Sequence, residues 1–378
     1  EADTVLQYST RMRRKEDMKK RESNLELMRV VLMCITPAYH LLVYNLILKA
    51  AWNDAMGVTL AFTVAGAIPA NYAFMAMSSY FLLEERGGTS LRRFLNTAAL
   101  TATLYLVRFA VIRGLYGFDS KEYMVEGFIT KGAWWYMDSY LILLLLYPFL
   151  NRFLRGIGRR AHLALAVALF GLLALFFVLG NMTLPGDLTG FLFIYVTMGY
   201  LRRGGYRKFL LLPVRTCPML LGAAACYFAL FAVGFVAKWP GFAVDRGLGN
   251  DILQYVISRY NVLAAVMGIC VFFFFRCLPV PQSRGINRVA EVTVYVFLLH
   301  ETVLGVFWYL GFLWFPMEGR PGPELFGWIA LFTAVSFGAA FVVKYLYERT
   351  AGRFWRRLIK RILETRPAKW MEDMETRL

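Results

Sequence analysis

The feature that most constrains this chain is a series of apolar runs, each roughly 20 residues long, separated by short basic clusters. A helix needs roughly 20 apolar residues to cross the hydrocarbon core of a bilayer. Hydrophobic residues make up 58% of the 378 residues, and the mean hydropathy is +0.50, which is high for a soluble domain. The net charge of +17 does not form one patch, so we expect a lipid bilayer and no nucleic acid as partner.

The predicted fold class is all-α, a polytopic membrane helix bundle with about ten transmembrane helices. With the N-terminus placed in the cytoplasm, and with the Lys and Arg in the outermost three residues of each span end counted with the adjoining segment, the inner segments hold 32 and the outer loops hold 7. Because Lys and Arg concentrate on the cytoplasmic side, both termini are predicted to be cytoplasmic. The ninth span is long enough to be tilted, kinked or subdivided. The predicted spans are 25–48, 57–82, 94–115, 132–150, 161–180, 188–201, 214–237, 256–278, 289–315 and 326–346.

The chain divides into a cytoplasmic basic segment (1–24), a transmembrane domain (25–346) and a cytoplasmic amphipathic basic tail (347–378). In the tail, "RFWRRLIKRILE" (353–364) places apolar residues at four-residue steps among Arg and Lys. This pattern is typical of a helix on the anionic inner leaflet; a helix that binds a regulatory partner is the alternative. The five cysteines are odd in number and lack a C-x-x-C spacing, so we predict no metal site.

The first predicted span carries three ionisable groups, although a charge at bilayer depth is costly and usually functional. Arg29 and His40 are eleven residues apart, which places them on one helix face about 16 Å apart along the axis. Glu26 lies within ion-pair reach of Arg29. The alternative is that Arg29 snorkels to lipid phosphates and His40 only bonds a neighbouring helix. Histidine is suited to proton transfer because its ordinary pKa is about 6.5.

Five stretches in order along the chain resemble the membrane-bound acyltransferase-3 family. In the first helix, ten residues separate Arg29 from His40, as they separate the Arg and the His of that family. Two departures are Ser79, where the family usually has Gly, and Asn96, which replaces the second Arg of an Arg-x-x-Arg pair that begins at Arg92 or Arg93. The stretches are "SNLELMRVVLMCITPAYH" (23–40), "NYAFMAMSSYFL" (71–82), "AWWYMDSYLILLLLYPFLN" (133–151), "YNVLAAVMGICVFFFF" (260–275) and "INRVAEVTVYVFLLHE" (286–301).

Within this family, the chain is similar to bacterial enzymes that O-acetylate cell-surface polysaccharides. The resemblance implies an enzyme, an acyltransferase of the bacterial cytoplasmic (inner) membrane. Its donor would be acetyl-CoA from the cytoplasm. Its acceptor would be a hydroxyl of a cell-surface glycan or a lipid-linked sugar. No metal would take part.

The expected catalytic residues are His40, Arg29, Glu26, His300 and Glu301. A neutral His40 would take the proton of the acceptor hydroxyl as general base. His300, at a comparable depth in the ninth span, would orient His40, hold the acyl group or only bond a carbonyl. Glu301 would face the interior of the bundle and pair with Arg108 or Arg259.

The expected donor-binding residues combine phosphate contacts with hydrogen-bond donors to the reacting carbonyl. Arg92 and Arg93 suit the phosphates of coenzyme A, although the alternative is that they only set topology. The hydrogen-bond donors are Ser78, Asn71 or Tyr295, with Asn261 as a further option.

The expected acceptor-binding residues are Trp135, Asp138, Asn261 and Arg259. Trp135 and Asp138 would form a sugar-facing patch with Trp134 and Tyr136, or else belong to an interfacial aromatic belt. His162 is interpreted as an interfacial residue without a catalytic role. Arg202 and Arg203 are interpreted as topology determinants.

A transporter is the alternative function, because intramembrane His, Arg and Glu also serve proton-coupled carriers. Against it, the sequence shows no paired internal halves. Consumption of acetyl-CoA distinguishes the two classes.

Overall fold

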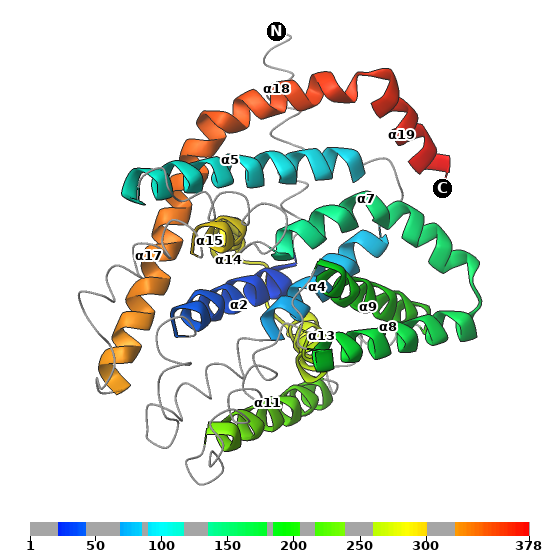
Figure 1. The fold of residues 1–378 in the computed structure, drawn as a ribbon, viewed down its shortest axis with the longest axis vertical. Coiled ribbons are helices and arrows are strands. Elements are labelled where there is room, and N and C mark those ends of the chain that lie inside the picture. The colour runs from blue at the N-terminus through cyan, green and yellow to red at the C-terminus, as the bar shows by residue number, and fades with distance from the viewer. Residues whose placement is uncertain are drawn as a thin grey trace.

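The computed structural model describes residues 22–42, 69–84, 90–116, 135–179, 184–204, 216–238, 260–300 and 322–377, and these residues form helices without a strand. Figure 1 shows the helices as a bundle, with α2, α4, α9 and α13 in its middle and α18 and α19 along one edge. The helices are α2 (Ser23–Leu42), α4 (Pro69–Glu84), α5 (Ser90–Tyr116), α7 (Trp135–Gly156), α8 (Arg159–Leu179), α9 (Leu184–Arg203), α11 (Thr216–Lys238), α13 (Val262–Cys277), α14 (Arg284–Ala290), α15 (Thr293–His300), α17 (Gly322–Arg349), α18 (Ala351–Leu363) and α19 (Arg366–Arg377).

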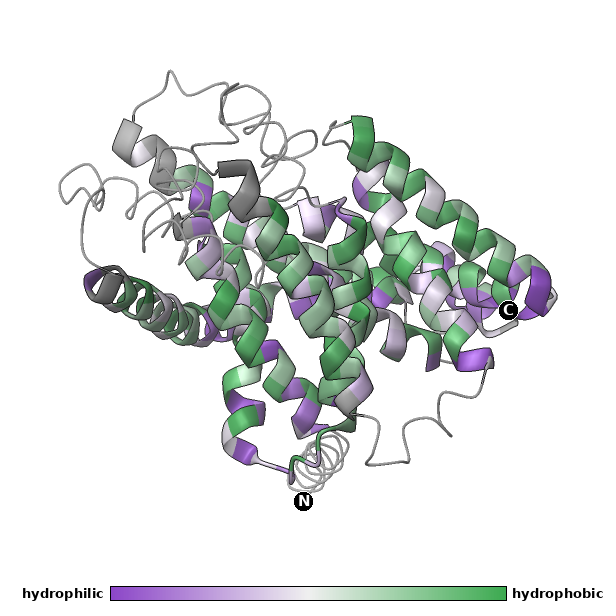
Figure 2. Ribbon diagram, turned by 90° about the horizontal axis from the view of Figure 1, so that it is seen from below, coloured by the Kyte–Doolittle hydropathy of each residue, from purple (hydrophilic) through white to green (hydrophobic). Residues whose placement is uncertain are grey.

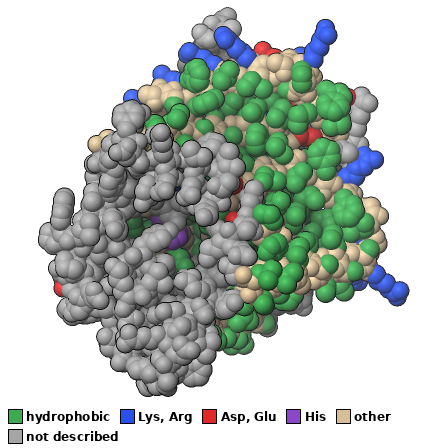
Figure 3. Space-filling view, in the orientation of Figure 1, with side chains coloured by type: hydrophobic (Ala, Val, Ile, Leu, Met, Phe, Trp, Pro, Cys, Tyr) green, Lys and Arg blue, Asp and Glu red, His purple; other side chains and the backbone are tan. Residues whose placement is uncertain are grey.

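Three helices in the described part of the chain are long and apolar enough to cross a membrane, namely those over Trp135–Gly156, Arg159–Leu179 and Phe326–Arg349. Figure 2 shows hydrophobic residues along most helices. Figure 3 shows a broad apolar surface on one face, with Lys and Arg at its margins. On α8, apolar side chains such as Val167 and Val178 are more than half exposed. Such a surface suits contact with lipid rather than with water.

The observed helices correct the predicted start of the sixth span, confirm the subdivision that was one expectation for the ninth, and leave the span count of ten as a prediction. The sixth helix begins at Leu184 and not at 188, because Pro185 lies in the first turn, where its missing N–H costs no intrahelical bond. The ninth predicted span is subdivided, since α14 ends at Ala290 and α15 begins at Thr293. A continuous apolar pattern reveals neither the start of α9 nor the break between α14 and α15.

The core centres on α4, which packs against α9 and α13. Gly268 of α13 lies so close to α4 that an added Cβ would stand 2.5 Å from Tyr72 Cβ. One polar junction is buried here: the Tyr195 hydroxyl donates to Asn151 Oδ1 (2.7 Å), and Asn151 Nδ2 donates to the Leu82 carbonyl (3.0 Å). These bonds fix the end of α4 against α7 and α9.

The tail forms the predicted amphipathic helix, but part of its apolar side contacts protein. In α18, Ile359 and Leu363 are buried against Ala99 and its neighbours on α5. The indole of Trp355 donates to Thr103 Oγ1 (2.9 Å). Phe354 remains 60% exposed. The structure therefore places α18 alongside α5, with only part of its apolar side exposed.

Candidate active site

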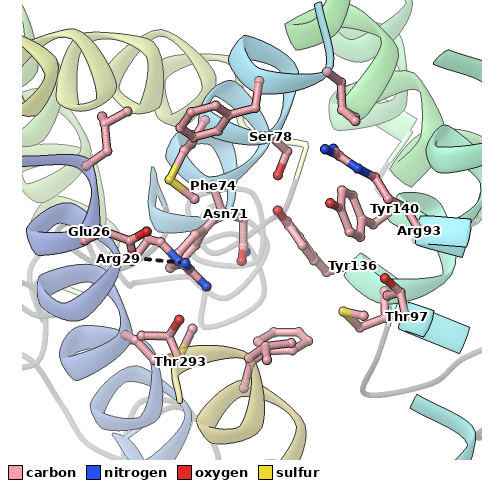
Figure 4. A pocket seen from close by; sticks show the side chains of 18 of the residues that line it. Glu26, Arg29, Asn71, Phe74, Ser78, Arg93, Thr97, Tyr136, Tyr140 and Thr293 are labelled. Atoms are coloured by element: carbon pink, nitrogen blue, oxygen red, sulfur yellow. Dashed lines mark hydrogen bonds and ion pairs between the residues drawn. The ribbon is translucent and has the colours of Figure 1, made fainter. Parts of the chain in front are cut away.

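A cavity of about 790 Å³ lies between α2, α4, α5, α7 and α15, within the size range of small-molecule and cofactor sites. Figure 4 shows the guanidinium groups of Arg29 and Arg93 on opposite sides of this cavity, with Asn71 between them. The hydroxyl groups of Ser78 and Tyr136 point toward each other in the same space. The cavity therefore presents a few polar groups among apolar and aromatic side chains.

The start of α2 is held by side-chain hydrogen bonds to distant parts of the chain. Ser23 Oγ donates to Asn287 Oδ1 (2.9 Å) and accepts the Ser283 N–H (2.8 Å). Asn24 Nδ2 donates to the Arg276 carbonyl (2.9 Å). Because these bonds join α2 to the end of α13 and the start of α14, they set the position of α2 relative to α15.

The predicted ion pair between Glu26 and Arg29 is confirmed. Arg29 Nη1 lies 3.0 Å from Glu26 Oε2, and both side chains are partly buried and line the cavity. Pairing lowers the cost of placing either charge in an apolar bundle. Arg29 thus faces the cavity, rather than snorkelling away from it.

The turn between α14 and α15 directs α15 toward α2. Lys344 of α17 forms an ion pair with Glu291 in this turn (3.0 Å), and Thr293 Oγ1 donates to the Ala290 carbonyl (2.8 Å). At the end of α15, His300 is 1% exposed. Its Nε2 lies 2.7 Å from His40 Nδ1, and the two rings are nearly parallel (20°).

The hydrogen bonds of this pair determine the tautomer of neutral His40. His300 Nδ1 lies 3.0 Å from the Val296 carbonyl, which can only accept, so Nδ1 carries the proton. His300 Nε2 then has a lone pair and accepts from His40 Nδ1–H. When both rings are neutral, the lone pair of His40 is therefore on Nε2, the atom that can take up a proton.

Neither His40 nor His300 belongs to the cavity lining, but the pair lies next to residues at one end of it. Thr36, which lines the cavity, is one helical turn before His40. Phe297 also lines the cavity, and its ring centroid is 5.8 Å from that of His300. The other end is lined by Glu22 and Glu84 at the expected cytoplasmic ends of their helices. The cavity thus extends from that side toward the histidine pair.

The structure distinguishes Arg93 from Arg92. Arg93 lines the cavity together with Asn96, whereas Arg92 is exposed outside it. Arg93 and Asn96 are three residues apart and so share a helix face. Whether either arginine contacts the donor stays a prediction, but only Arg93 belongs to this cavity, because Arg92 points to another side of α5.

Several other predicted site residues do not line this cavity. Tyr295 is turned toward α17, where its ring contacts Tyr347 (6.2 Å between centroids). Asn261 caps α13, because its Oδ1 accepts the N–H groups of Leu263 and Ala264. Trp135 and Asp138 also stay outside the cavity lining, whereas their neighbours on α7, Tyr136 and Met137, belong to it. Glu301 and Arg259 lie outside the described residues.

Ser79, at the position where the resemblance expects Gly, is fully buried. Its hydroxyl donates to the Met75 carbonyl (2.7 Å) in the preceding turn of α4. The additional side chain is thereby satisfied within its own helix and does not enter the cavity lining.

Comparison with protein families completes this description. The family model of an acyltransferase domain, that of the acyltransferase-3 family, matches residues 22–362. The chain belongs to the acyltransferase-3 family. Comparisons with curated proteins and with solved structures gave no match. The family and the membrane-spanning helices together identify the protein as a membrane acyltransferase.

Some cavity residues of this acyltransferase were missed in the sequence analysis, although a helical spacing marks them. Thr293 and Phe297 precede His300 by seven and three residues, so all three share one face of α15. Tyr140 lies one turn after Tyr136 on α7. The signal was helical periodicity, the same rule that placed Arg29 and His40 on one face, applied to the other helices.

Proposed function

We propose that the protein is an O-acetyltransferase that moves an acetyl group from cytoplasmic acetyl-CoA to a hydroxyl of an extracytoplasmic or lipid-linked glycan. The observation that carries this proposal is the His40–His300 pair beside the end of a cavity whose other end holds Arg29 and Arg93. A long thioester donor needs this combination, with cations for its phosphates at one end and a base near its reactive carbon at the other.

The residues present fit the donor. Arg93 gives a planar, charge-assisted donor for phosphate. The apolar side chains of α2 and α4, including Met33 and Phe74, line the space between the two ends. Asn71 and Ser78 lie in the same lining and supply hydrogen-bond donors for the polarised carbonyl oxygen.

In the proposed reaction, His40 Nε2 takes the proton from the acceptor hydroxyl while that oxygen bonds to the thioester carbonyl carbon. The carbon–sulfur bond then breaks, and the imidazolium returns the proton to the departing sulfur. His300 Nε2 accepts from His40 Nδ1–H throughout, which holds the ring and stabilises its protonated form. Arg29 and Glu26 keep the inner part of the same helix face in place.

The proposal is tested with purified protein in lipid nanodiscs, radiolabelled acetyl-CoA and membrane glycan extract. We expect label in the glycan and a stoichiometric release of free thiol. Label in the glycan in an amount equal to the thiol requires transfer chemistry, so the two readouts together separate this function from transport and from hydrolysis of the thioester. Intact acetyl-CoA after long incubation with competent glycan would contradict the proposal.

Donor binding provides a second prediction, with a matched control in the same helix turn. Arg93→Ala removes a cation that lines the cavity, so KM for acetyl-CoA should rise by about 10-fold while kcat changes little, since a ground-state contact is lost. Arg92→Ala removes the same charge from an exposed position and should leave KM nearly unchanged. Steady-state kinetics measures both, and equal effects of the two variants would contradict a specific role for Arg93.

A further inference from the structure

A second cavity, of about 360 Å³, lies where the ends of α4, α7 and α9 meet the start of α8. It is separate from the acyltransferase cavity, although Glu84 at the end of α4 lines both. We propose that it is a binding site for a phosphate group. This inference does not depend on the proposed transfer reaction.

The charge of the cavity lining favours a phosphate. Among the described residues that line the cavity, three are arginines, namely Arg155, Arg202 and Arg203, and one is acidic, Glu84. Arginine presents forked donors that match the oxygens of a phosphate. The sequence interpretation of Arg202 and Arg203 as topology determinants explains their side of the membrane but not their convergence on one cavity.

The arrangement of the hydrogen-bond donors at this cavity also favours a phosphate. Arg203 is already bonded to protein, since it donates to the carbonyls of Ile157 (2.6 Å) and Arg155 (2.8 Å) at the end of α7. It therefore fixes the wall of the cavity. Arg202 Nη1 is buried, and no hydrogen-bond partner for it is found among the described residues. A buried donor of this kind is costly unless a ligand or solvent satisfies it.

The side chain of His162 also lines this cavity and is only 1% exposed. Its interpretation as an interfacial residue stays a prediction, and the structure adds that the side chain is buried in the protein. Its Nε2 donates to the Val196 carbonyl (2.9 Å), so the lone pair of the neutral ring is on Nδ1. Nδ1 is buried without a hydrogen-bond partner among the described residues. A phosphate that retains one P–OH group satisfies both this acceptor and the Arg202 donor.

Gly199 lets α9 pack closely against the imidazole of His162. A Cβ at this position of α9 would stand 3.3 Å from both His162 Cε1 and Leu154 Cδ1, which is closer than ordinary van der Waals contact. Glycine thus lets α9 approach the imidazole closely while the arginines at the end of the same helix remain around the cavity.

The phosphate can belong to a soluble molecule or to an anionic lipid headgroup, because the cavity lies at the expected cytoplasmic face.

The test uses the full chain and two probes. Binding of inorganic pyrophosphate to detergent-solubilised protein is measured by calorimetry, and retention of phosphatidylglycerol over phosphatidylcholine is measured by native mass spectrometry. The variants are Arg202→Gln and, as a second position in the cavity lining, Arg155→Gln. Arg160→Gln, which removes a charge from an exposed position outside the cavity lining, is the control.

We expect both cavity variants to weaken one of the two probes by about 10-fold or more, which is the usual effect of losing a hydrogen bond to a charged group. The control should stay within about twofold of the unmodified protein. Loss of pyrophosphate binding assigns the site to a soluble phosphate, and loss of phosphatidylglycerol retention assigns it to a lipid headgroup. Unchanged binding of both probes, or an equal loss in Arg160→Gln, would overturn the proposal.

Discussion

His40→Ala is expected to lose acetyl transfer by ~10²-fold or more while acetyl-CoA affinity stays within about twofold. General base catalysis contributes typically 10²–10⁴-fold, and the proposed base is His40 Nε2. Arg93, the proposed phosphate contact, belongs to the cavity lining on α5, whereas His40 is on α2 and outside that lining. The measurement pairs single-turnover transfer of labelled acetyl with equilibrium binding of the donor.

His300 provides the comparison that separates a base from a positioning residue. His300→Ala removes the acceptor of the His40 Nδ1–H bond, so kcat should fall less than in His40→Ala and the donor KM should stay unchanged. His300→Gln offers an amide oxygen to the same N–H and should restore part of kcat. Near-normal transfer by His40→Ala would show that the pair is only structural.

The spacing within one helix was predictable from the sequence, because α-helical geometry alone decides it. Arg29 and His40 share a face, and Glu26 pairs with Arg29 as expected. The meeting of His40 with His300 was one of three alternatives expected for His300, and helix spacing alone could not choose among them. It depends on the turn between α14 and α15, and on the hydrogen bonds that join Ser23 to Asn287 and Ser283 across the chain.

Helix rotation decides which of the polar candidates line the cavity, and the sequence analysis did not use it to choose among them. Tyr295 lies two residues after Thr293, which is about 200° around the helix, so one faces the cavity and the other faces α17. The same reason separates Arg93 from Arg92. The role of Asn261 was within reach of the sequence, because Asn directly before an apolar helical run is a common N-cap.

Gly268 shows a constraint that composition does not reveal, and it gives the prediction with the largest effect on folding. An added Cβ would meet Tyr72 Cβ at 2.5 Å, Ala73 N at 2.8 Å and Tyr72 C at 2.9 Å. Two of these atoms belong to the backbone of α4, so no side-chain rotation relieves the contact. Overpacking of this kind costs about 1–3 kcal/mol or more, and α4 must move away from α13.

Gly268→Ala should therefore lower the melting temperature of the purified protein by several degrees, or greatly reduce the yield of folded protein. Because Asn71 and Ser78 line the cavity from the same helix, a displaced α4 should also raise KM for acetyl-CoA in the protein that does fold. Gly171→Ala is the matched control: an added Cβ meets nothing within 4 Å on α8, and alanine favours helix by up to about 1 kcal/mol. Thermal unfolding followed by size-exclusion chromatography compares the two variants. Equal melting temperatures and an unchanged KM would show that α4 and α13 are not packed as closely at Gly268 as the structure places them.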